Sequence, residues 1–117
     1  MTPTYTFKLN NLPETEPLQA LIEQKFSAFA KYWGNEQVLC EIEFDKVAPR
    51  QNGQIHRLEA NVTVGATLYR AEAVEESFEK AIDEVRDELD KQMRRAKDKE
   101  DTLNKKAGRE LKEEMMG

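Results

Sequence analysis

The residues of this chain best suited to chemistry are five basic side chains crowded into residues 87–100. They are Lys91, Arg94, Arg95, Lys97 and Lys99. On a helix, Lys91, Arg95 and Lys99 would share one face at spacings of four residues, where like charges repel. Arg94 and Lys97 would flank that face. A dense group of cations of this kind is suited to binding an anion such as phosphate.

The same run also has a simpler interpretation as the polar end of a helix. The chain as a whole has a formal net charge of −5, and the residues before the run are mostly acidic. A helix dipole favours acids at its start and bases at its end by about 0.3–1 kcal/mol each. The pairs Asp87–Lys91 and Asp90–Arg94 add about 0.2–0.5 kcal/mol each. These effects explain the order of the charges but not their density, so both interpretations stay open.

Other kinds of site find little support in the sequence. One histidine, His56, and one cysteine, Cys40, cannot supply the three or four ligands of a zinc site. Cys40 falls on the inward side of an alternating segment, which predicts a small buried hydrophobe instead of a nucleophile. The glycines form no loop that would cradle a phosphate. We therefore predict no enzyme activity, no metal, no cofactor and no small-molecule substrate.

Length and composition predict a small single domain. The chain has 117 residues, of which 38% are hydrophobic and 35% charged. Such a length supports one core, and a single cysteine excludes an internal disulfide. No segment approaches the ~18 apolar residues of a membrane span, and residues 1–9 do not resemble a signal peptide. We expect a cytoplasmic protein that does not bind membranes and is monomeric when free.

Four segments alternate between apolar and polar residues, which predicts four strands with one buried face each. The segments are 4–9, 38–44, 56–64 and 67–74. The inward side chains are Tyr5, Phe7, Leu9, Val38, Cys40, Ile42, Phe44, Leu58, Ala60, Val62, Val64, Tyr69, Ala71 and Ala73. The other face carries Glu41, Glu43, Arg57, Glu59, Asn61, Thr63 and Arg70, and we expect it to be wet.

Two segments have a helical period. The first starts near Thr15, a suitable N-cap, and ends at Gly34-Asn35. Its apolar stripe is Leu18, Leu21, Ile22, Phe26, Phe29 and Trp33. The second starts at Ser77 and has the stripe Phe78, Ile82, Val85, Leu89, Met93 and Ala96. Residues 101–117 are predicted to be a charged tail, mobile or weakly helical.

This order predicts an α+β fold of the type β-α-β-β-β-α, with a four-stranded sheet and both helices on one face. Lys25 and Lys31 lie off the apolar stripe of the first helix. If the helices are neighbours, these lysines join the second helix's bases in a strip suited to a phosphate backbone. Tyr32 is the one candidate for base stacking, which favours recognition of backbone and shape over sequence.

The stretch LYRAEAVEESFEKAIDEVRDELDKQMRRAKDK resembles the short ribosome-hibernation factors, the ribosome-associated inhibitor or protein Y family. The similarity rests on Ala81-Ile82-Asp83 and on the closing run Leu89, Lys91-Gln92-Met93, Arg95, Lys97 and Lys99. EQKFSAFAKYW is similar to the end of that family's first helix. The resemblance spans roughly residues 4–99.

The resemblance implies the same fold and a stress-response role in translation. The factor would bind the decoding region of the small ribosomal subunit, in the channel of transfer and messenger RNA, and silence idle ribosomes. The implied contacts to 16S-type ribosomal RNA are Lys25, Lys31, Lys91, Arg95, Lys97 and Lys99, and we add Arg94 on physical grounds. Residues 1–100 would be the ribosome-binding domain. Ala28 and Glu88 replace usual lysines, which should remove about one phosphate contact each.

Three alternatives remain. The first is an acidic protein-interaction module that binds no nucleic acid, which suits the net charge. The second is another RNA binder such as a double-stranded-RNA module, but that module has lysines where this chain has EESFE. The third is a small enzyme, for which the residues supply no catalytic constellation.

Overall fold

The computed structural model describes residues 2–10, 12, 16–47 and 55–116, of which 102–116 are described by their backbone. The element order is β1 (Thr4–Asn10), α1 (Glu16–Phe26), η1 (Ser27–Phe29), α2 (Ala30–Trp33), β2 (Val38–Lys46), β3 (His56–Val64), β4 (Thr67–Glu75) and α3 (Phe78–Met116). The predicted α+β fold is confirmed. The predicted cap at Thr15 and the Pro49 and Asn52-Gly53 turn signals lie outside the described residues.

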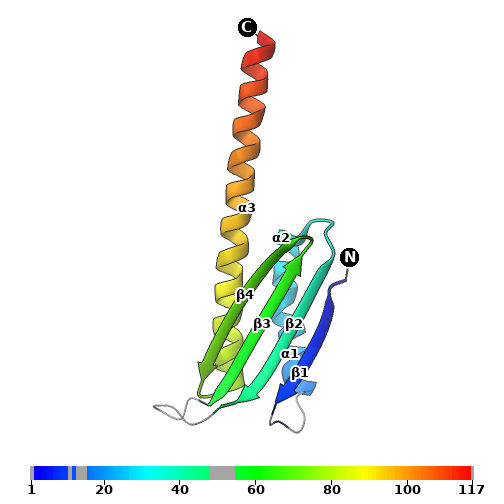
Figure 1. Cartoon of the computed structure of the whole chain (residues 1–117), viewed down its shortest axis with the longest axis vertical. Coiled ribbons are helices and arrows are strands. Elements are labelled where there is room, and N and C mark those ends of the chain that lie inside the picture. Colours follow the sequence, from blue (N-terminus) through cyan, green and yellow to red (C-terminus); the bar gives the residue numbers. More distant parts are fainter. Residues whose placement is uncertain (1, 11, 13–15, 48–54, 117) are drawn as a thin grey trace.

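The four strands form one mixed sheet in the order β1-β2-β3-β4. β1 and β2 are parallel because the first helical segment connects them across the sheet. The pairs β2–β3 and β3–β4 are antiparallel. All helices lie behind the sheet in Figure 1, so the other face of the sheet stays open.

The core fills the space between the sheet and the helices, as the two periodicities predict. The sheet contributes Cys40, Ile42, Phe44, Leu58, Ala60, Val62, Ala71 and Ala73. The helices contribute Ile22, Phe26, Phe29, Trp33, Phe78, Ala81, Ile82, Val85, Leu89 and Met93. The small alanines of β3 and β4 lie where α3 packs on those strands, and they let the helix approach closely.

The first helical segment is not continuous, although its apolar stripe is. A 3₁₀ turn, Ser27–Phe29, separates α1 from α2. The hydroxyl of Ser27 donates to the carbonyl of Gln24 at 2.5 Å. A serine that bonds the preceding turn in this way competes with the α-helical pattern and favours a local tightening. Phe29 and Trp33 stay buried across the turn, so the interruption leaves the core intact.

α3 begins as predicted, with the backbone N–H of Lys80 donating to the Ser77 hydroxyl at 3.2 Å. It then continues without a break past residue 100 to Met116. Figure 1 shows this last part of α3 extending beyond the end of the sheet. Whether 101–117 forms a separate tail in solution stays a prediction. No helix of the described chain has both the length and the apolar composition that a membrane span requires.

The turn between β3 and β4 depends on Gly65, whose φ is +60°. Its N–H donates to the carbonyl of Gln37 at 2.9 Å, which fixes the turn against the chain before β2. A Cβ here would stand 2.6 Å from Glu36 Oε2, but that carboxylate is the mobile end of a side chain. We expect Gly65→Ala to lower the free energy of unfolding by about 1–2 kcal/mol, mainly through the left-handed backbone. Urea denaturation measures this loss of stability. Gly65→Asn should lower the free energy of unfolding by less, because asparagine tolerates the left-handed conformation better than alanine. A larger loss for asparagine than for alanine would contradict the backbone explanation.

Candidate nucleic-acid interface

Side chains of the first helical segment meet α3 along a seam in which the two run side by side. Lys25 forms an ion pair with Asp83. The hydroxyl of Tyr32 donates to Asp90 Oδ1 at 2.9 Å. Lys97 Nζ lies 3.4 Å from the carbonyl oxygen of Lys31 and donates to it. α2 therefore faces the middle of α3, where the predicted basic residues are concentrated.

Three predicted site residues gather at that end of the seam, and we call Lys31, Arg94 and Lys97 the seam group. All three are exposed. Arg94 lies 4.0 Å from Asp90, the residue that also binds Tyr32, so it is on the side of α3 that faces α2. The ammonium of Lys31 stands 5.1 Å from the centroid of the Tyr32 ring. Here the structure brings the bases of both helices together, as the sequence predicts.

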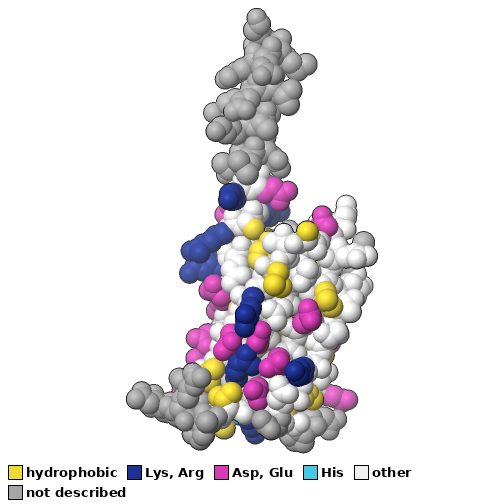
Figure 2. All heavy atoms as spheres, in the orientation of Figure 1, with side chains coloured by type: hydrophobic (Ala, Val, Ile, Leu, Met, Phe, Trp, Pro, Cys, Tyr) yellow, Lys and Arg dark blue, Asp and Glu magenta, His cyan; other side chains and the backbone are white. Residues whose placement is uncertain are grey.

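The other predicted site residues of α3, Lys91, Arg95 and Lys99, form an outer group on a different flank. The amide of Gln92 donates to the carbonyl of Arg70 at 2.9 Å, which places Gln92 beside β4. At 100° per residue, Arg95 and Lys99 follow Gln92 by one and two turns and lie on nearly the same side. Figure 2 shows Lys and Arg side chains gathered on this flank of α3, beside the sheet. The predicted bases of α3 therefore spread around the helix from the side that faces α2 to the side that faces β4.

Two of the predicted residues have acidic neighbours. Lys25 is partly buried, with 24% of its side chain exposed, and its ion pair with Asp83 joins α1 to α3. A phosphate would have to compete with that carboxylate. Lys91 lines a shallow hollow together with Glu72, Glu84, Asp87 and Glu88. The assignment of all seven residues to RNA contact stays a prediction.

A second hollow, which we call the end cleft, opens where α3 leaves the sheet. It lies between α2, the β3–β4 turn and α3, and its volume is about 540 Å³. Tyr32, Trp33 and Tyr69 are among the lining residues, together with Lys31 and Lys97 of the seam group. The indole N–H of Trp33 is buried and has no hydrogen-bond partner within the described part of the chain. No periodicity or motif of the sequence indicates this cleft, because its walls come from three distant segments.

Cys40 and His56 are both packed against other residues of the fold. Cys40 is fully buried, and burial raises the pKa of its thiol to about 12 although a hydrogen bond with Tyr5 opposes this. His56 packs its ring against Phe78 at 4.8 Å, and its Nδ1 lies 3.3 Å from the carbonyl of Glu75. Within the described residues, no group of three or more metal-ligating side chains is present.

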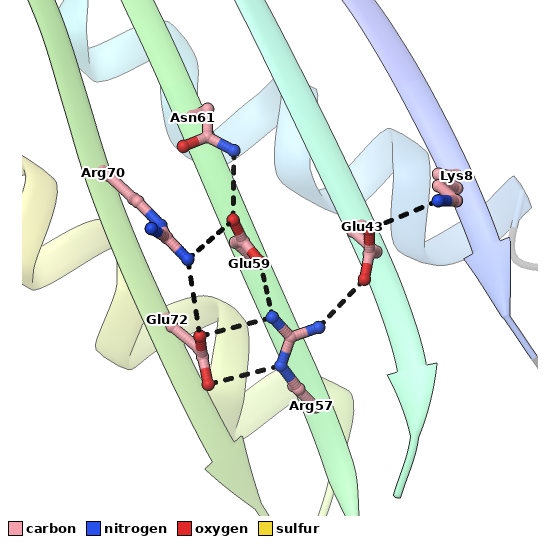
Figure 3. Close-up of polar contacts among 7 residues, drawn as sticks. All are labelled: Lys8, Glu43, Arg57, Glu59, Asn61, Arg70 and Glu72. Atoms are coloured by element: carbon pink, nitrogen blue, oxygen red, sulfur yellow. Dashed lines mark hydrogen bonds and ion pairs between the residues drawn. The ribbon is translucent and has the colours of Figure 1, made fainter.

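The open face of the sheet carries a network of ion pairs (Figure 3). Glu43, Glu59 and Glu72 are cross-strand neighbours on β2, β3 and β4 and form a row of three carboxylates. Arg57 bonds all three: to Glu43 at 3.0 Å, to Glu72 at 3.2 Å, and closely to Glu59. The face is wet, as predicted, but its side chains shield one another, and only 18% of the Arg57 side chain is exposed.

A comparison with known protein families assigns the chain to one of them. Residues 5–101 match the family described as sigma 54 modulation protein / S30EA ribosomal protein. The chain belongs to this family. The match spans every described strand and the helices up to the end of the basic run, and the S30EA family is a ribosome-associated family, not one of enzymes. No curated protein sequence matches the chain.

Solved structures show the same fold. The Thermus thermophilus protein Y N-terminal domain superposes with a TM-score of 0.64 at 20% identity, covering 79% of this chain and 97% of that one. A ribosomal subunit interface protein from Coxiella burnetii superposes with a TM-score of 0.60 at 17% identity, covering 80% of this chain and 98% of that one. At such identities the likeness concerns the fold.

Proposed function

We propose that this S30EA-family chain is a hibernation factor that binds the decoding region of the small ribosomal subunit and blocks translation there. The observation that carries the proposal is the seam group, in which cations from two helices converge on a protein whose net charge is −5. Ribosomal RNA offers closely spaced phosphates, and exposed lysines and arginines bind them without reading sequence. Such a role places the protein in the cytoplasm.

The described geometry also suggests how the contact is divided. The seam group and the outer group lie on two flanks of one helix, so they would meet two different phosphate tracks. RNA in folded ribosomes presents such grooves, which proteins recognise mainly by shape. Lys25 would contribute least, because Asp83 already neutralises it.

A protein-interaction module without nucleic-acid binding is the second candidate. It would use the acidic open face of the sheet. There, Glu43, Glu59 and Glu72 are already paired with Arg57, and Arg70 lies 3.1 Å from Glu59. A face whose carboxylates satisfy one another offers little unpaired charge to a partner, so we place this function second.

A sedimentation experiment separates the two functions. We expect the protein to cosediment with purified small subunits and with whole ribosomes at low salt, and to be released as salt rises. Lys91→Glu combined with Arg95→Glu should abolish cosedimentation while leaving the circular dichroism spectrum and the melting temperature unchanged. A double variant that cosediments as well as the wild type would remove the outer group from the interface. If the wild-type protein does not cosediment with ribosomes or small subunits, the proposed function is wrong.

A further inference from the structure

The end cleft contains residues that have no part in the proposed phosphate contacts. Its lining combines the aromatic residues Tyr32, Trp33 and Tyr69 with charged side chains of both signs. Its volume of about 540 Å³ is within the range of about 300–1,000 Å³ that is typical of small-ligand sites. Contact with RNA backbone needs exposed cations only, so the aromatic residues of this hollow are left for a second ligand group.

The charges of the lining restrict what that group is. Lys31 and Lys97 are accompanied by Glu36, Glu100 and Asp101. The carboxylates outnumber the lysines, so a phosphate at the lysines complements only part of the lining. A ligand that fits must carry one anionic group for the lysines and hydrogen-bond donors for the carboxylates. It must also have a flat apolar face for the aromatic side chains.

The buried indole of Trp33 is a second, independent observation. Trp33 is 6% exposed, and its N–H is a donor without an acceptor among the described residues. A buried donor left unpaired costs about 1–3 kcal/mol. An acceptor on a ligand that enters the cleft would remove that cost if the ring shifts to meet it.

We propose that the end cleft receives the base of one unpaired ribonucleotide, whose phosphate lies at Lys31 and Lys97. Bases stack on aromatic side chains irrespective of sequence, and each carries a ring nitrogen or a carbonyl oxygen that accepts from an N–H donor. The exocyclic amino groups of adenine, cytosine and guanine donate to carboxylates such as Glu36, and uracil has no such group. A base in a duplex is stacked and paired, so the nucleotide must be single-stranded.

This inference refines the proposed function, because it rests on the same α2–α3 surface meeting ribosomal RNA. It adds a specific prediction, which is that the protein alone binds short single-stranded RNA weakly and with the cleft occupied. Phosphate contacts by exposed lysines would give no such saturable site. The two ideas can therefore fail separately.

Adjacent residues of β4 provide a matched pair of variants. Thr67 lines the cleft, whereas Leu68 is 58% exposed and, by strand alternation, lies on the other face of the sheet. Thr67→Phe would fill the mouth of the cleft without changing charge. Leu68→Phe adds the same ring on the face of the sheet opposite the cleft. Both are exposed strand positions, where an aromatic residue is well tolerated.

The experiment titrates the ¹⁵N-labelled protein with fluorescein-labelled oligoadenylate and oligouridylate, following anisotropy and the indole N–H signal of Trp33. We expect the signal to shift with oligoadenylate, and Thr67→Phe to weaken binding roughly tenfold while Leu68→Phe does not. Tighter binding of oligoadenylate than of oligouridylate supports the role of the carboxylates. Binding that leaves the indole signal in place, or that survives Thr67→Phe, would overturn the inference. Cosedimentation of Thr67→Phe with ribosomes would show that the proposed function stands without it.

Discussion

Reversing the charge of both Lys31 and Lys97 is expected to abolish binding to the small ribosomal subunit. Lys97 Nζ lies 3.4 Å from the Lys31 carbonyl oxygen, so the two side chains leave the seam at one place and would meet the same stretch of RNA. The reversed side chains would stand beside Glu100 and Asp101 in the lining of the end cleft. A phosphate would then meet four carboxylates, with Arg94 as the remaining cation of the seam group, and would be repelled.

The milder change Lys31→Gln with Lys97→Gln gives a quantitative test. Each phosphate contact contributes about one unit to the slope of log K against log salt concentration. Losing both contacts should lower that slope by roughly two, measured by binding of labelled protein to small subunits over a salt series. An unchanged slope would mean that neither lysine touches a phosphate, even if the affinity falls.

A control with the same change in charge guards against a general electrostatic effect. Lys46 at the end of β2 and Lys80 near the start of α3 are both exposed and distant from the seam group. Lys46→Glu with Lys80→Glu makes the chain as acidic as Lys31→Glu with Lys97→Glu does. We expect the control to retain most of the binding at moderate salt. If both double variants lose binding equally, net charge and not the seam group controls the interaction.

The sequence predicts the fold well because local patterns determine each element. The alternation in 56–64 gives β3 its observed bounds, and Ser77 starts α3 as its hydroxyl predicts. The apolar stripes of the helices and the inward residues of the strands meet in a single core. The exception is the 3₁₀ turn that begins at Ser27, where a side-chain hydrogen bond to the Gln24 carbonyl competes with the helical pattern.

The candidate site is less predictable because it depends on which residues face one another across helices. Helical spacing places Lys91 and Arg95 on one face, but it does not say which flank α2 occupies. That is decided by the pairs Lys25–Asp83 and Tyr32–Asp90, whose partners are 58 residues apart in sequence. The end cleft is harder still, because α2, the β3–β4 turn and α3 form it only when folded.

The arrangement of the carboxylates on the open sheet face likewise depends on the strand register. Glu43, Glu59 and Glu72 look like separate solvated residues in the sequence, yet the register lines them up across three strands. Like charges directly opposite each other destabilise a sheet. Arg57 and Arg70 offset this repulsion, and the stability of the sheet should therefore depend on them.

Replacing Arg57 with methionine is expected to lower the free energy of unfolding by about 2 kcal/mol at neutral pH, because three carboxylates lose a charged donor. Methionine keeps much of the apolar stem, so the change mainly removes the guanidinium. Hydrogen bonding to Glu72, with further bonds to Glu43 and Glu59, raises the pKa of Arg57 despite its partial burial, so it stays charged at any practical pH.

The effect should depend on pH in a definite direction. Partial burial of Glu59 opposes its ionisation, but hydrogen bonds from Asn61 and Arg57 and the charge of Arg70 outweigh this and lower its pKa. A carboxyl whose pKa is lower in the folded state stabilises the fold above its ordinary pKa of about 4.3. That stabilisation is lost as pH falls through the lowered value. The difference between the wild type and Arg57→Met should therefore shrink in acid.

Urea denaturation at pH near 7 and near 3.5 measures both effects. At the lower pH Glu59 approaches its lowered pKa and is protonated more often, so we expect the cost of Arg57→Met to fall to about 1 kcal/mol or less. Arg70→Met is the comparison, because 60% of that side chain is exposed and exposed ion pairs contribute about 0.2–1 kcal/mol. An equal loss at both pH values would show that Arg57 acts by packing its stem on β3. A loss for Arg70→Met as large as for Arg57→Met would mean that the row of carboxylates is balanced by both arginines together.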